Sequence, residues 1–264
     1  MIYLKENAVE NSITEIENRV NLKQINRSAT LLVAFVRPLL FLSVQGLVIL
    51  LFIALNCKTP VLSVTSWWTV YGTVVDAGCL LTLYLLLRKE RMHIFDLISF
   101  DKSKVKFDLL IGLCIILIVF PLTMFIGSAL GSFSVYGSIK PDLPAGNPMT
   151  RALPLWAAIY SKAIWWIISA PTEELIYQGY ALPRLQVFFG NKVPAVLWVG
   201  FAWALQHSFL PFINLKYALF AFLLFFPLAI AMQVIYLRVK RLLPLIIGHW
   251  GMDCISAVFM IAVN

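Results

Sequence analysis

Ionisable side chains lie inside stretches of this chain that are otherwise largely apolar. Five of them are Glu173, Glu174, His207, His249 and Asp253. A charged side chain at the centre of a membrane-spanning helix costs about 2.5 to 3.5 kcal/mol on insertion scales, so such groups usually face the protein interior and mark a pathway or a reaction centre. These residues are therefore the first candidates for a functional site.

The composition indicates a membrane protein. Hydrophobic residues make up 61% of the 264 residues, charged residues only 13%, and the mean hydropathy is +0.86. The apolar residues come in runs long enough to cross a hydrocarbon layer about 30 Å thick. We expect an all-α, polytopic integral membrane helical bundle with about seven transmembrane helices, eight being possible, over residues 34–56, 63–87, 107–129, 152–174, 193–210, 217–239 and 242–262.

The first thirty residues differ from the rest of the chain. Residues 1–30 mix Glu, Asn and Lys, which predicts a cytoplasmic N-terminal tail and not a cleaved signal peptide, and residues 31–264 are expected to form one membrane-embedded domain. The apolar residues of the tail recur at spacings of three and four, at Val9, Ile13, Ile16 and Val20. A helix on the membrane surface and a disordered tail both remain open.

Lysine and arginine are concentrated in alternate connections between the expected spans. The net charge is +8, and short cytoplasmic loops retain positive charge. The basic residues assigned to the cytoplasmic side are Lys5, Arg19, Lys23, Arg27, Arg37, Arg88, Lys89, Arg91, Lys102, Lys104, Lys106, Arg184, Lys192, Arg238, Lys240 and Arg241. This bias predicts a cytoplasmic N-terminus. Topology explains the charge, so the expected partner is the lipid bilayer and not nucleic acid.

The first motif places two carboxylates next to each other after a proline, at Pro171, Glu173 and Glu174. Successive helical residues point about 100° apart, so one glutamate can act while the other supports it, and Gln178 lies one turn beyond Glu174 on the same face. The proline can kink the span, so the region 152–189 is either one long kinked helix or two shorter ones. A purely structural explanation of the motif is that Thr172 caps a new helix, whose first turn favours acidic residues.

The other two motifs are an aromatic-rich stretch ending at His207, and His249 with Asp253 four residues later, which share one helix face. At a rise of about 1.5 Å per residue from the nearest cytoplasmic basic residue, Glu173, His249 and His207 lie at depths of roughly 16, 12 and 22 Å. All three depths fall in the middle of the layer. The sequence therefore predicts that three helices bring an acid and two imidazoles together.

In this order, the motifs resemble the CPBP group of intramembrane proteases, which includes the CAAX prenyl endopeptidases and the Abi-like bacteriocin-processing and self-immunity proteins. The resemblance covers roughly residues 171–253, through Glu173, Glu174 and Gly179, then His207, then His249 with Asp253. The sequence departs from the family at two positions. Gln178 stands where the family typically has Arg, and Asp253 stands where it often has Asn.

The resemblance implies an intramembrane endopeptidase that hydrolyses a peptide bond with a glutamate-activated water, in a bacterial plasma membrane, acting on a peptide or protein substrate. Glu173 is the expected general base, helped by His207, while His249, oriented by Asp253, donates to the oxyanion. Glu174 and Gln178 are expected to support the site. No metal or cofactor is expected. Gln178 leaves Glu174 without the usual cation, which puts activity in question.

Three other functions stay open. The Glu, His and Asp set is also a reasonable ligand set for zinc, although no HExxH helix is present. A non-proteolytic membrane immunity or partner-binding protein of the same fold is favoured by Gln178. A transporter is possible because buried acids and imidazoles also relay protons, but no internal repeat supports it. Outside the motifs, Asp76 and Lys162 are expected to form a structural pair in the membrane.

Overall fold

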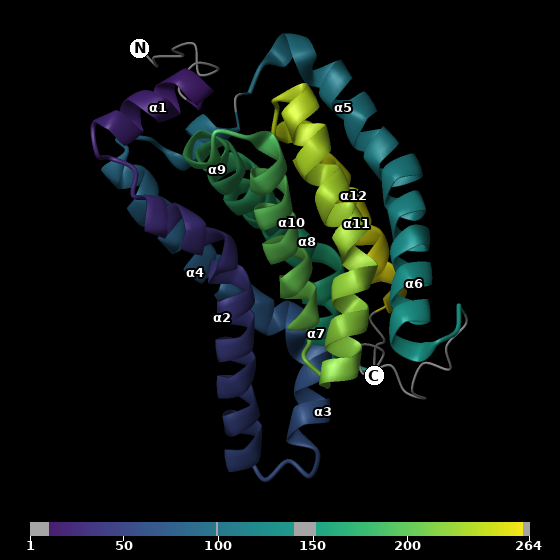
Figure 1. Cartoon of the computed structure of the whole chain (residues 1–264). Helices are drawn as coiled ribbons and strands as arrows, with labels where there is room; N and C mark the ends of the chain where they lie inside the picture. Colours follow the sequence, from purple (N-terminus) through teal and green to yellow (C-terminus); the bar gives the residue numbers. More distant parts are fainter. Residues whose placement is uncertain (1–10, 99, 140–151, 261–264) are drawn as a thin grey trace.

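The computed structural model describes residues 11–98, 100–139 and 152–260, and every regular element within these ranges is helical (Figure 1). The α-helices are α1 (Ile13–Asn21), α2 (Arg27–Ala54), α3 (Pro60–Val64), α4 (Trp68–Lys89), α5 (Val105–Cys114), α6 (Phe120–Tyr136), α7 (Leu155–Tyr160), α8 (Trp166–Glu174), α9 (Leu182–Phe189), α10 (Lys192–Ser208), α11 (Leu215–Val239) and α12 (Leu243–Met260). The all-α prediction is confirmed.

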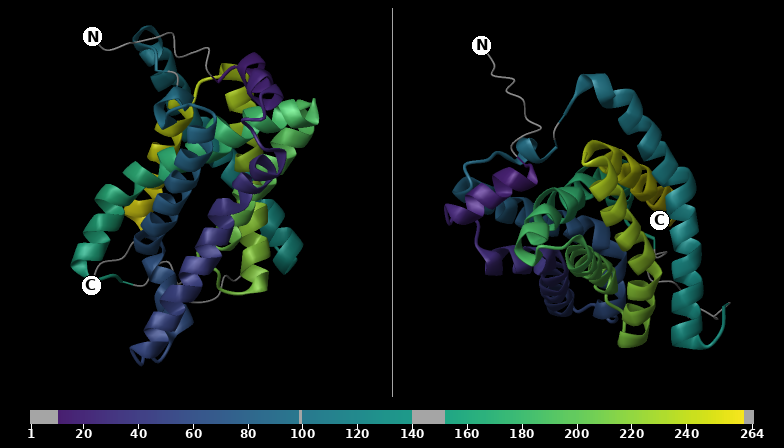
Figure 2. Two further views of the ribbon diagram at one scale, coloured as in Figure 1. Left: turned by 90° about the vertical axis from the view of Figure 1, so that its left-hand side faces the viewer. Right: turned by 45° about the horizontal axis from the view of Figure 1, so that its top comes forward.

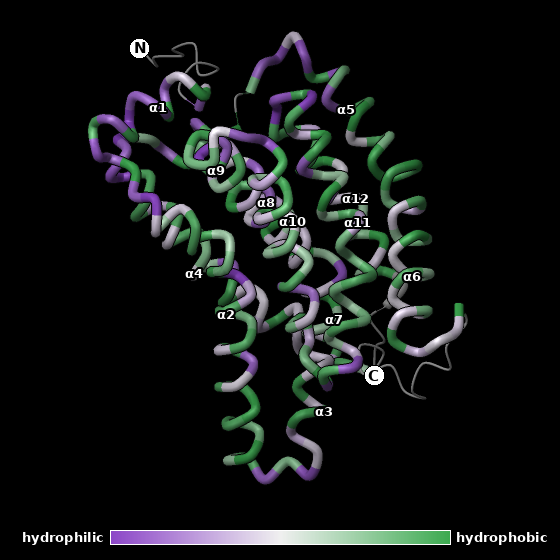
Figure 3. Tube along the Cα trace, in the orientation of Figure 1, coloured by the Kyte–Doolittle hydropathy of each residue, from purple (hydrophilic) through white to green (hydrophobic). Residues whose placement is uncertain are grey.

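Among the residues that the structure describes, four helical runs are long and apolar enough to cross a membrane, and one shorter apolar helix accompanies them at Leu243–Val258. The four are Arg27–Ala54, Pro60–Lys89, Lys102–Tyr136 and Leu215–Val239. Hydrophobic residues predominate along much of α2, α6 and α11 (Figure 3), and several of their large apolar side chains are exposed. Leu47 on α2 is 66% exposed and Phe125 on α6 is 73% exposed, as lipid-facing residues are. The chain is an integral membrane protein, and the count of seven spans stays a prediction.

The two glutamates of the first motif lie in an unbroken helical run. α7, α8 and α9 follow one another without a loop and are joined by π-helical segments at Ser161–Trp165 and Leu175–Ala181. Pro171 lies inside α8 and has no N–H for the carbonyl of Ile167, which accepts instead from the indole of Trp250, at 3.3 Å. The long kinked helix is therefore the correct alternative for this region, and Thr172 begins no new helix.

The helix of the N-terminal segment is present, but it packs against protein. Ile16 in α1 is fully buried, and α1 lies against α9 (Figure 1). The side-chain amide of Asn11 donates to the carbonyl oxygen of Gly179, at 2.9 Å, so this segment is tied directly to the helix of the first motif. Residues 1–10 of the expected tail lie outside the described residues.

Some basic residues assigned to the cytoplasmic surface are buried ion-pair partners. Arg184 is fully buried, and its Nε donates to Glu90 Oε1 at 3.0 Å. Arg241 donates from Nε to Asp108 Oδ1 at 2.7 Å. An arginine is held inside when a carboxylate from another helix offsets the loss of water. Their positive charge therefore pairs with carboxylates inside the protein.

The bundle is assembled around α8 and α10. The right-hand view of Figure 2 shows α5 and α6 as one curved rod along the outside, and α11 and α12 pack against this rod. α2 and α4 run together as a hairpin that projects beyond the rest (Figure 1). Tyr177 and Tyr180 of the helix that carries the first motif share one buried core with Trp203, Val199, Met232 and Leu245 from the surrounding helices.

We predict that the approach of α6 to α11 depends on Gly127. A Cβ atom at Gly127 would overlap the carbonyl oxygen of Leu224, which is backbone and cannot turn away. Close helix contacts in membranes rely on such small residues. Gly127→Ala is expected to destabilise the fold by about 1 to 3 kcal/mol, measured as thermal unfolding in detergent micelles. Gly46→Ala is the matched control because nothing lies within 4 Å of its added Cβ, and equal melting of both variants would contradict the prediction.

Candidate active site

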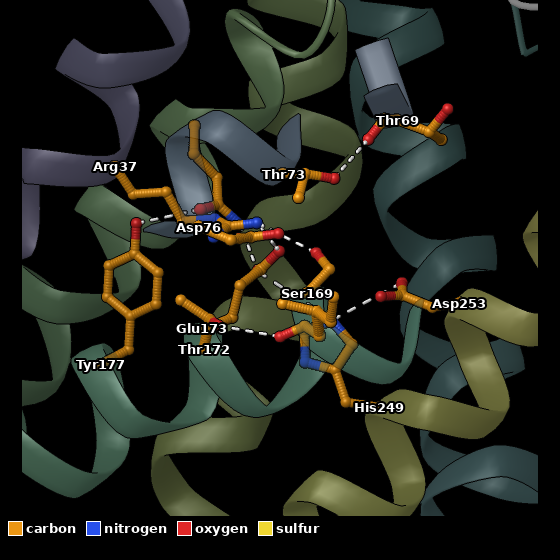
Figure 4. A network of polar contacts seen from close by, with 12 residues as sticks. Arg37, Thr69, Thr73, Asp76, Ser169, Thr172, Glu173, Tyr177, His249 and Asp253 are labelled. Atoms are coloured by element: carbon orange, nitrogen blue, oxygen red, sulfur yellow. Dashed lines mark hydrogen bonds and ion pairs between the residues drawn. The ribbon is translucent and has the colours of Figure 1, made fainter. Parts of the chain in front are cut away.

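Glu173 lies at the centre of a buried polar network (Figure 4). It sits on the last turn of α8, and its two carboxylate oxygens face different partners. Oε1 accepts a hydrogen bond from Nη2 of Arg37, at 2.9 Å. Oε2 accepts from Nε2 of Gln206 and lies 4.0 Å from Nε2 of His249. The carboxyl thus points into the bundle, within reach of an imidazole from α12.

Glu174 points about 100° away from Glu173 around the helix, as consecutive helical positions require, and approaches the other nitrogen of the His249 ring. Its Oε1 lies 2.8 Å from Nδ1 of His249, a hydrogen bond between α8 and α12. The other ring nitrogen, Nε2, faces Glu173 and lies 3.7 Å from Oδ1 of Asp253, which is longer than a hydrogen bond. The structure therefore gives Glu174 the hydrogen bond to His249 that orients the ring, while Asp253 lies beside the ring as a nearby charge.

His207 reaches Glu173 through Gln206. The His207 ring stacks on Phe225, with centroids 3.7 Å apart and planes 11° apart, and its Nε2 lies 3.4 Å from Nε2 of Gln206. Tyr177 donates its hydroxyl to Oε1 of Gln206, at 3.0 Å, which fixes the amide so that its N–H groups point toward Glu173 and His207. His207 can accept one of these N–H groups only as a neutral ring with its proton on Nδ1.

Arg37 is the main residue that the motifs do not identify. It lies on α2 with 1% of its surface exposed, and it donates from Nη1 to Asp76 on α4 and from Nη2 to Ser169 Oγ at 3.0 Å on α8. The expected pairing of Asp76 with Lys162 is wrong, because the guanidinium of Arg37 occupies Oδ1 of Asp76. The feature of the sequence that could have identified Arg37 is its position inside an apolar run, just before Pro38.

Gln178 is fully buried, and neither atom of its side-chain amide has a hydrogen-bond partner among the described residues. The same holds, within those residues, for Oε2 of Glu174, Oδ2 of Asp253 and Nε1 of Trp203. A buried polar atom without a partner costs about 1 to 3 kcal/mol. Such atoms around the two glutamates show that the interior of the bundle stays polar at this depth, which suits a hydrolytic site.

The described residues contain no group of three His, Cys, Asp or Glu side chains arranged to hold a metal ion. What the geometry does bring together is one imidazole among three carboxylates, with Glu173, Glu174 and Asp253 all near the ring of His249. A carboxylate and an imidazole at this spacing can share a water and stabilise a developing negative charge. The fold and the site therefore define a membrane-embedded helical protein with a buried acid and imidazole centre.

A comparison with protein families gives the class. The family model described as Type II CAAX prenyl endopeptidase Rce1-like matches residues 154–255. This match agrees with the resemblance carried by the motifs, and it supports a relation to the CAAX-type membrane proteases over residues 154–255. The family implies a protease with a peptide or protein substrate. Arg37 and Asp76 lie outside the matched segment. No curated protein and no solved structure matches the chain.

We predict that Gln206 is required for the stability of the network. Gln206→Leu removes the acceptor of the Tyr177 hydroxyl and one donor to Glu173, so two buried polar groups lose their partner. The expected loss is about 1 to 3 kcal/mol, measured by thermal unfolding in detergent micelles. Gln186→Leu on α9 serves as the control because Gln186 is only part-buried and makes a long 3.5 Å bond to a backbone carbonyl. A Gln206→Leu protein that melts with the control would refute the prediction.

Proposed function

We propose that the protein is an intramembrane endopeptidase that hydrolyses a peptide bond with a water activated by Glu173. The observation that carries the proposal is the 4.0 Å separation between Oε2 of Glu173 and Nε2 of His249, inside a bundle that shields both from solvent. That distance is too long for a direct hydrogen bond, and a single water can bond to both atoms at once.

Glu173 is the proposed general base. Arg37 engages Oε1, so Oε2 is the oxygen that faces His249 and takes the proton of the attacking water. The water oxygen forms a bond to the carbonyl carbon of the substrate, and the carbonyl oxygen becomes an oxyanion. When the C–N bond breaks, the proton held by Glu173 goes to the leaving amine. Atoms and charges balance without a further reactant.

His249 is the proposed donor to the oxyanion. Its Nδ1 is held by Glu174 at 2.8 Å, which fixes the plane of the ring and directs Nε2 toward Glu173. With both nitrogens protonated, Nδ1 donates to Glu174 and Nε2 donates to the oxyanion. Asp253 adds negative charge 3.7 Å from Nε2 and favours the positive ring. His207 supports the base through Gln206, and Gln178 lines the interior behind the two glutamates.

The proposal places the protein in the plasma membrane of a bacterium with a cytoplasmic N-terminus, and it assigns a membrane-associated peptide or protein as the substrate. The charge bias supports this orientation, and the family match supports the substrate class. A metal-free, cofactor-free reaction is part of the same proposal, because Glu173 and His249 already supply a base and an oxyanion donor.

The decisive experiment measures cleavage of candidate membrane-associated peptides by purified protein in proteoliposomes. Glu173→Gln keeps the size of the side chain but removes the base, so kcat is expected to fall by about 10²- to 10⁴-fold. Glu17→Gln on α1 is the control, because this carboxylate is exposed and lies far from the network. Addition of a chelator is expected to leave the wild-type rate unchanged. Undiminished cleavage by the Glu173→Gln protein would end the assignment.

A second function is favoured by one observation. Gln178 stands at the position where the family has a cation, and its buried amide atoms have no partner among the described residues, as expected if the protein binds a partner without cleaving it. In that case Glu173→Ala and His207→Ala proteins retain full biological activity in cells. Loss of activity in both variants supports the protease instead.

A further inference from the structure

Arg37 carries a permanent charge into the network from a helix that the family match does not cover. It lies on α2, while its partners Asp76, Ser169 and Glu173 lie on α4 and α8. We propose that Arg37, anchored by Asp76, is the positioning residue of the site: it holds Glu173 in its charged form and leaves Oε2 directed at His249. The inference rests on the proposed role of Glu173 as the base.

The geometry of the guanidinium fits this role. One terminal nitrogen, Nη1, donates to Asp76, and the other, Nη2, donates to Glu173 Oε1 at 2.9 Å and to Ser169 Oγ at 3.0 Å. Ser169 lies four residues before Glu173, on the same face of α8, so both side chains meet the same nitrogen. A planar fork held at its other end cannot rotate freely, so it fixes one carboxylate oxygen. The other oxygen, which accepts from Gln206, is left facing His249.

The charge arrangement supports the same conclusion. Glu173 lies beside Glu174 on the helix and near Asp253 across it, and negative neighbours at this depth disfavour a second carboxylate charge. Gln178, on the motif helix itself, is neutral. Arginine stays protonated under all conditions that a protein meets, so Arg37 offsets these neighbours at every pH. The positive charge beside Glu173 comes from Arg37 on α2, because the helix of the motif supplies none there.

A purely structural tether between α2, α4 and α8 is the alternative. Stability alone gives little reason to bury such a group, because replacing a buried ion pair with apolar residues is often neutral or stabilising. The chain also offers a matched comparison. Arg184 is equally buried and pairs with Glu90 in the same way, but it lies on α9, away from the network around Glu173. A tether and a positioning residue therefore predict different results at Arg37 and Arg184.

The first test separates kcat from KM in proteoliposomes. Arg37→Gln is expected to lower kcat by about 10²-fold with KM changed less than about twofold, since the base is misplaced and substrate contacts are kept. Arg37→Lys keeps the charge but lacks the fork, so a smaller loss of about tenfold is expected. Arg184→Gln is expected to lower the melting temperature and to keep the kcat of the folded protein. Equal kcat losses at Arg37 and Arg184 would assign both residues to structure.

The second test does not depend on cleavage. A hydrophobic carbodiimide, dicyclohexylcarbodiimide, reacts with protonated carboxyls inside a membrane, and peptide mass spectrometry locates the adduct. Glu173 is expected to be unlabelled in the wild type and in Arg184→Gln and Arg37→Lys, and labelled at least about tenfold more in Arg37→Gln.

Unchanged labelling of Glu173 in folded Arg37→Gln overturns the proposal. If Arg37→Gln does not fold, Arg37→Lys decides: wild-type kcat in that variant overturns the positioning role, and the tenfold loss supports it. The two proposals can also fail separately. If the wild type cleaves no substrate but the labelling of Glu173 changes as expected, the role of Arg37 in holding Glu173 is supported and only the protease assignment is refuted.

Discussion

Buried carboxylates of this bundle are bound by basic side chains that come from other helices. Arg37 joins α2 to Glu173 across 136 residues of sequence, and His249 joins α12 to Glu174 across 75. The pairs Arg184 with Glu90 and Arg241 with Asp108 repeat the pattern at other places. Removing one partner of such a pair costs about 3 to 5 kcal/mol, whereas apolar contacts between helices gain little over contacts with lipid. The arrangement of the helices therefore depends on the ion pairs as well as on close packing.

The helix from Leu155 to Phe189 provides the geometry that these pairs need. Glu173 and Glu174 are consecutive, so they point about 100° apart. Glu173 meets Arg37 on α2 and faces Nε2 of His249 on α12, while Glu174 bonds to Nδ1 of the same ring. The π-helical segments before and after α8 shift the register of the run, and Trp250 satisfies the carbonyl of Ile167 that Pro171 leaves free. One helical run can thus present two acids to the two nitrogens of one imidazole without leaving its backbone unsatisfied. Glu173, the candidate base, and Glu174, which orients His249, are separated only by the rotation between consecutive residues of one helix and not by a loop.

The sequence predicted the helical class and the family, and it placed Glu173 and His249 at similar depth, because apolar runs and motif order are local properties. It did not predict the partners. From the sequence, Arg37 resembles a cytoplasmic charge because a basic residue near the start of an apolar run usually is one, and depth alone pairs Asp76 with Lys162. Nothing in the sequence marks Gln206 as a contact of Glu173, because it is simply the residue before His207. Each of these assignments depends on which helices touch, and composition and spacing carry no information about contacts between residues so far apart in the chain.

The location of Arg37 changes what counts as the site. The matched family segment, 154–255, holds Glu173, His207 and His249, but the charge that faces Oε1 of Glu173 comes from α2, and the carboxylate that anchors this charge comes from α4. A displacement of the α2 and α4 hairpin relative to α8 would therefore move the carboxylate of Glu173, even though the motifs themselves stay intact. Gln178 adds no charge to the motif helix, and the cation that contacts Glu173 comes from a neighbouring helix. In this protein the N-terminal helices are part of the candidate active site and not only its anchor in the membrane.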